Sequence, residues 1–83
     1  MKRIVDVDME IRTGNAQKAL DKFFKKYPEL DYWRGELEYM AENGIDYEVS
    51  DRDTDGRPVK AWAWALHFDI DEDHAYIAII ERA

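Results

Sequence analysis

His67 is the residue best suited to acid–base chemistry in this chain, because imidazole titrates near neutral pH. It lies in an alternating run, residues 62–68, and a two-residue turn at Asp71-Glu72 would place it opposite Tyr76 on one sheet face. A flat sheet face offers no water-excluding cleft, however, and no nucleophile in the sequence has a base behind it. We therefore expect a histidine that contacts a tyrosine, in a protein that is not an enzyme.

Three aspartates at alternate positions, Asp51, Asp53 and Asp55, match the first half of an EF-hand calcium loop together with Gly56. The match fails further on, because Trp62 occupies the place of the bidentate glutamate and the flanking residues alternate as strands do. Calcium binding here is a weak alternative to a solvated acidic turn.

A second acidic cluster spans residues 69–74 and adds His74 as a candidate metal ligand. One histidine among carboxylates at a hairpin tip is a weak metal signal, and like charges there also discourage edge-to-edge aggregation. We expect no metal and no cofactor.

Charge narrows the classes of partner. The 83 residues carry 12 Lys and Arg against 19 Asp and Glu, for a net charge of −7. This excess of negative charge disfavours nucleic acid and anionic membranes, and favours a basic protein partner or plain solubility. The absence of cysteine fits a reducing compartment, and the N-terminal residues form neither a signal peptide nor a membrane span, so we expect a cytoplasmic protein.

Periodicity indicates the elements that hold these groups. Residues 2–11 alternate as a half-buried strand, and helical spacing begins at Ala16 after a cap at Thr13 or Asn15. Pro28 ends this helix and opens a second one, which stops at Asn43-Gly44. The two helices should form a hairpin.

Asp55-Gly56 predicts a hairpin with a two-residue turn, because both residues accept positive φ. In that register Val49 pairs with Trp62 and Tyr47 with Trp64, so the large residues face the helices. A second two-residue turn at Asp71-Glu72 adds Ala75, Ile77 and Ile79 to the core.

The expected fold is a single α+β domain over residues 1–83. Its elements follow the order β-α-α-β-β-β in a two-layer sandwich, with a helix hairpin on one face of a four-stranded antiparallel sheet. The run at residues 76–80 is apolar on both faces, which favours a central strand and the spatial order 2-3-4-1. The order 4-3-2-1 is the alternative.

The sheet face away from the helices, here called the open face, is the candidate binding surface. A small apolar floor with an acidic rim is the usual anatomy of a contact surface for another protein or for a second copy of the chain. The alternative is a bare solvated face. The predicted members are Asp6, Asp8, Glu10, Asp46, Glu48, Ala61, Ala63, Ala65, His67, Tyr76, Ala78 and Ile80.

Two functions from different classes follow from these residues. The first is a small acidic protein-binding module that occupies a basic site on a partner, by analogy with phage anti-defence and immunity proteins that act as stoichiometric inhibitors. The second is an engineered or de novo designed scaffold with no native activity. Capped helices and an Asp-Gly turn agree with the local consistency expected of a designed sequence.

Overall fold

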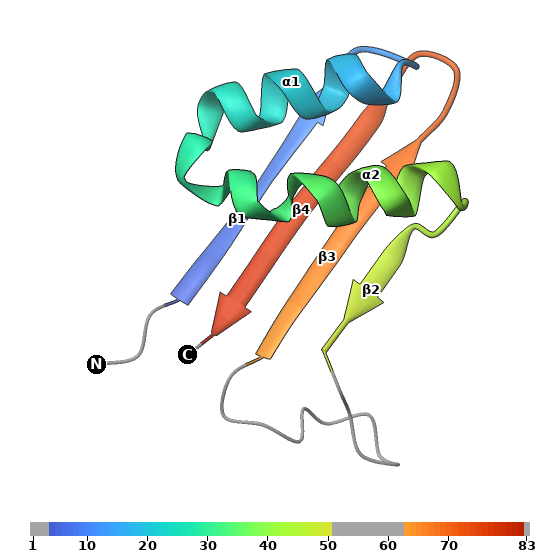
Figure 1. Ribbon diagram of the computed structural model, residues 1–83. Coiled ribbons are helices and arrows are strands. Elements are labelled where there is room, and N and C mark those ends of the chain that lie inside the picture. The colour runs from blue at the N-terminus through green and yellow to red at the C-terminus, as the bar shows by residue number, and fades with distance from the viewer. Residues whose placement is uncertain (1–3, 51–62, 83) are drawn as a thin grey trace.

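Four strands form one antiparallel sheet in the computed structural model, which describes residues 4–50 and 63–82 (Figure 1). The strands lie in the order β1-β4-β3-β2, which confirms the predicted order 2-3-4-1 and the pairing of the first strand with the last. The described helices all cross the same face of this sheet (Figure 1). In chain order the elements are β1 (Ile4–Ile11), α1 (Ala16–Lys26), the 3₁₀ helix η1 (Pro28–Trp33), α2 (Arg34–Glu42), β2 (Tyr47–Val49), β3 (Ala63–Ile70) and β4 (Ala75–Arg82).

Helix α1 begins at the predicted cap. The side chain of Asn15 accepts a hydrogen bond from the backbone N–H of Lys18 at 3.0 Å, and the Thr13 hydroxyl accepts one from the N–H of Asn15 at 3.1 Å. Both candidate cap residues therefore satisfy backbone donors that the first helical turn leaves unpaired. Lys25 and Lys26 lie in the last turn, where positive charge complements the helix dipole.

The second predicted helix is divided into two parts, η1 and α2. A 3₁₀ helix has three residues per turn, so Leu30 and Trp33 stack on the same side and both turn toward the core. Helix α2 then ends at Glu42, and Gly44 follows with a φ of +66° that suits glycine; the N–H of Ile45 donates to the carbonyl of Met40 at 2.9 Å. Ile45 packs against the core beside this cap.

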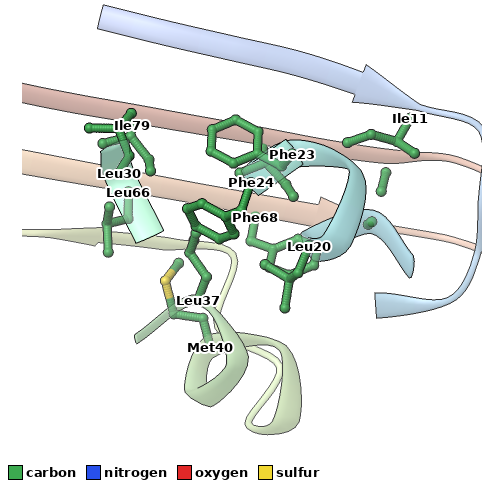
Figure 2. Close-up of a cluster of buried hydrophobic side chains, with 13 residues drawn as sticks. Ile11, Leu20, Phe23, Phe24, Leu30, Leu37, Met40, Leu66, Phe68 and Ile79 are labelled. Atoms are coloured by element: carbon green, nitrogen blue, oxygen red, sulfur yellow. The ribbon is translucent and has the colours of Figure 1, made fainter. Parts of the chain in front are cut away.

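The core lies between the helices and the sheet (Figure 2). Apolar side chains from α1 and α2 meet those from β3 and β4, and each large side chain so buried contributes roughly 1.5–3 kcal/mol of transfer free energy. The buried apolar residues are Ile11, Ala19, Leu20, Phe23, Phe24, Leu30, Leu37, Met40, Leu66, Phe68, Ala75, Ile77 and Ile79.

The β3–β4 hairpin turns on more residues than predicted. Ile70 pairs with Ala75, so residues 71–74 form a four-residue loop in place of a two-residue turn. The carboxylate of Asp71 accepts hydrogen bonds from the backbone N–H groups of Asp73 and His74, which favours this longer loop. The register moves by two residues, and the predicted core residues Ala75, Ile77 and Ile79 keep their face.

The predicted register of β2 against β3 is wrong by three residues. Val49 pairs with Ala65 and Tyr47 with His67, whereas the Asp55-Gly56 turn predicted Trp62 and Trp64 as their partners. The turn and Trp62 lie outside the described residues. At its other end β2 begins two residues after Ile45, whose N–H is bonded to the α2 carbonyl of Met40. An odd shift exchanges the two faces, so Tyr47 and Val49 lie on the open face and not in the core.

Candidate functional site

The open face combines one acidic row with a wider apolar area. Asp6, Asp8 and Glu10 on edge strand β1 are exposed there, as predicted. Strands β4 and β3 carry the predicted floor, and β2 adds two residues that the sequence placed in the core. The floor and its added margin consist of Tyr76, Ala78, Ile80, Ala63, Ala65, His67, Tyr47 and Val49.

Two predicted members of the open face belong to the other side of the sheet. Glu48 pairs with the core residue Leu66, and the same register extended by one residue puts Asp46 opposite the core residue Phe68, whose N–H donates to the Asp46 carbonyl. Both predictions failed because they rested on the wrong β2 register. Ala61 lies outside the described residues. Of the carboxylates predicted for the open face, those on β1 keep their place, and Asp69 on β3, which pairs with Tyr76, adds one exposed carboxylate to the same face.

The carboxylates on β1 differ in their contacts. The Tyr76 hydroxyl donates to Asp8 Oδ2 at 3.0 Å, and His74 Nε2 lies 3.3 Å from Glu10 Oε2. The bond to Asp8, followed by burial and by the surrounding carboxylates, raises the pKa of Tyr76 above its ordinary value. Within residues 4–50 and 63–82, no lysine or arginine forms an ion pair with any of these three carboxylates.

A line of rings crosses the apolar area. His67 makes edge-on contacts with Tyr47 at 6.1 Å and with Tyr76 at 5.2 Å between ring centroids. The predicted contact between His67 and Tyr76 is confirmed, although His67 pairs directly with Ala78. The line continues through the Tyr76 hydroxyl to Asp8, so it joins all four strands.

Beside these rings the face is hollowed. A shallow depression of about 190 Å³ lies where β2, β3 and β4 run together. Its walls are mainly apolar, and Arg82 contributes a guanidinium group to them. It is lined by Tyr47, Val49, Ala63, Trp64, Ala65, Ile80 and Arg82.

The described acidic loop at residues 71–74 shows no cluster of metal-binding side chains. Across the whole described part of the chain, no three side chains among histidine, aspartate and glutamate lie together as a metal would need. Asp71 is occupied by the backbone N–H groups of Asp73 and His74, which hold its pKa below the ordinary value. Asp51, Asp53 and Asp55, the candidate calcium ligands, lie outside the described residues.

A buried carboxylate on the helix side was not predicted. Glu81 is only 2% exposed, and its Oε1 accepts hydrogen bonds from the Tyr32 hydroxyl and the Trp33 indole N–H. The Trp33 ring packs against Trp64, the cross-strand neighbour of Glu81, at 5.1 Å between centroids. The alternation of Ala75, Ile77 and Ile79, extended by one step, would have indicated this burial.

A pair of carboxyl groups lies at the β2 edge of the same side. Glu48 and Glu36, in the first turn of α2, are both half-buried and share a hydrogen bond. Glu48 Oε1 is buried and meets no donor within the described residues. Two ionised carboxylates cannot bond to each other, so this bond needs one shared proton. The hydrogen bond to Glu36, then burial and the Glu36 charge, raise the pKa of Glu48 to about 7.

Comparisons with known proteins identify no relative of this chain. No protein-family model matches the chain, and searches of curated proteins and of solved structures find no significant match. No helix in the described part of the chain combines the length and the apolar character that crossing a membrane requires.

Proposed function

We infer that this protein is a small, non-catalytic protein-binding module whose open face binds a basic surface of a partner protein. The observation that carries this proposal is an apolar hollow on the same sheet face as three carboxylates that form no ion pair with a described lysine or arginine. The described helices leave this face uncovered (Figure 1).

The arrangement has the two components of a protein contact surface. The hollow at Val49, Ala65 and Ile80 provides the apolar centre, where one buried side chain of a partner contributes most of the binding energy. The β1 carboxylates provide a charged margin, and the net charge of −7 accelerates encounter with a cationic surface. Inhibition of that partner by occupation of its basic site, in the cytoplasm, is the form of this function that we favour.

The alternative functions have less support. Calcium binding at Asp51, Asp53 and Asp55 depends on residues outside the described part of the chain. An idealised scaffold avoids buried polar atoms without a hydrogen-bond partner, and Glu48 Oε1 is such an atom within the described residues.

Site-directed photocrosslinking tests the proposal. A photoreactive residue replaces Ala65 in the hollow, and a second protein carries it at Lys22, which is exposed on α1. Both are used at matched concentration in a lysate of the source cells. We expect a stoichiometric crosslink to a basic protein from position 65 and none to that protein from position 22.

Charge reversal supplies the matched control. Asp6→Lys with Glu10→Lys alters the acidic row, and Glu29→Lys with Glu42→Lys makes the same change in net charge on exposed positions of the helix layer. The first pair should weaken the crosslinked complex roughly tenfold or more, and the second should leave it nearly unchanged. Equal effects of the two pairs would show that only net charge matters and would overturn an assignment to the open face.

A further inference from the structure

We propose that the partner binds β1 as an added fifth strand, through an extended segment that carries lysine or arginine at alternate positions. This inference rests on the proposed function and specifies the chemistry of the partner.

The backbone of β1 is suited to strand addition. All eight residues of β1 pair with β4 without a bulge, and none is proline. In an antiparallel ladder, alternate residues direct their N–H and C=O groups to the partner strand, and the others direct them away from it. No described strand lies on the outer side of β1, so these groups form an open row along one edge of the sheet. The opposite edge, β2, is only three residues long.

The side chains of β1 define what such a segment must carry. Asp6, Asp8 and Glu10 are exposed on the open face, and cross-strand neighbours of opposite charge stabilise a sheet. On the helix side, Val5, Val7 and Met9 pack against the core but stay only partly covered. An added strand would place basic residues beside the β1 carboxylates on the open face. Its aliphatic residues, on the opposite face, would cover the valines and Met9.

A second copy of the chain does not meet these requirements. Two β1 strands that continued one sheet with their faces aligned would bring Asp6, Asp8 and Glu10 of each copy together. Like charges directly opposite are destabilising, so the acidic row opposes self-pairing at neutral pH. The same row favours a cationic strand.

A synthetic nine-residue peptide that alternates lysine and valine serves as the probe. It is titrated into the full-length, isotope-labelled protein, and amide resonances and hydrogen exchange are followed. We expect chemical-shift changes concentrated on β1 and at least tenfold slower exchange of those β1 amides that face away from β4. A peptide with glutamate in place of lysine should not bind.

Two further peptides separate backbone pairing from charge attraction. One is N-methylated at every lysine and the other at every valine, so that each loses the donors along one of its edges while side chains and charge are retained. At least one of them should bind at least tenfold more weakly than the parent. Equal binding by all three, shifts confined to β2 and β3, or no binding at millimolar peptide would each overturn strand addition. The proposed function would survive any of these results if the photocrosslink from position 65 still required Asp6 and Glu10.

Discussion

Glu81 and Glu48 point to the same, helix-covered side of the sheet but meet opposite surroundings. Glu81 is 2% exposed and receives two hydrogen bonds, from the Tyr32 hydroxyl and the Trp33 indole. Glu48 lies at the β2 edge, less deeply buried, and its neighbour is another carboxyl group, Glu36. Glu81, the more deeply buried carboxylate, receives hydrogen bonds from two donors. Glu48, which is less buried, can bond to its neighbour only when one of the two carboxyl groups is protonated.

This difference shows that depth alone does not decide whether a carboxylate fits a protein interior. The cost of removing a carboxylate from water is offset where N–H or O–H groups replace the lost water, as they do at Glu81. Where the nearest group is a second carboxylate, the pair lowers its free energy by holding one proton between them. Glu81 should thus act as a structural anchor, and Glu48 with Glu36 as a proton-sensitive contact between α2 and β2.

The largest expected effect is that of Glu81→Ala. The substitution removes the acceptor from the Trp33 N–H and leaves a cavity between β4 and the helices, so we expect a loss of about 3 kcal/mol in the free energy of unfolding. Urea denaturation followed by tryptophan fluorescence measures it. Glu81→Gln keeps an acceptor oxygen and nearly the same volume, and should cost only about 1 kcal/mol. Equal losses in the two variants would show that the carboxylate, and not its role as acceptor, carries the stability.

The next effect is a pH dependence assigned to Glu48. Its pKa is 4.5 in the unfolded chain and about 7 in the folded protein, so the folded state binds more protons between these values. The free energy of unfolding therefore falls as the pH rises through this window. The full shift corresponds to about 3 kcal/mol, and solvent screening of this half-buried edge pair reduces the expected loss to about 1–2 kcal/mol.

Glu48→Gln and Glu36→Gln are the matched tests of that assignment. Each removes one member of the pair, so each should stabilise the protein at pH 8 and flatten the dependence between pH 5 and pH 8. Asp71 changes the stability with pH in the opposite direction. Backbone N–H groups lower its pKa, so its contribution to the free energy of unfolding is lost on acidification. Because Asp71 is present in the variants and in the wild type, its contribution cancels when their free energies of unfolding are subtracted at each pH. A wild-type slope retained in both variants would assign the pH dependence to other groups.

The smallest expected effect is that of Gly35→Ala, which separates the stability of α2 from the protonation of Glu36. Gly35 is exposed in α2, and a Cβ atom there would meet nothing within 4 Å. Alanine should stabilise the helix by about 0.5 kcal/mol. Thermal denaturation at pH 5 and pH 8 should show the same gain at both values. A gain confined to one pH would mean that helix formation and proton binding are coupled.

Sequence reasoning succeeded where one element carried its own signal. Alternation in residues 2–11, the Asn15 cap and the two-faced apolar run at residues 76–80 led to the correct elements and strand order. The position of Glu81 follows from the same alternation, although its donors Tyr32 and Trp33 come from another element. The Glu36–Glu48 pair depends on both the helix phase of α2 and the register of β2, and a three-residue error in that register moved Glu48 to the wrong face.

The edge-on contacts of His67 with Tyr47 and Tyr76 also make the open face observable by spectroscopy. Aromatic rings shift the magnetic resonance of protons held near them, and the size of the shift changes steeply with ring orientation. The imidazole carbon-bound protons of His67 should therefore resonate away from their random-coil positions. A ligand that displaces either tyrosine ring would move these signals, giving an intrinsic, label-free reporter of occupancy at the centre of the sheet.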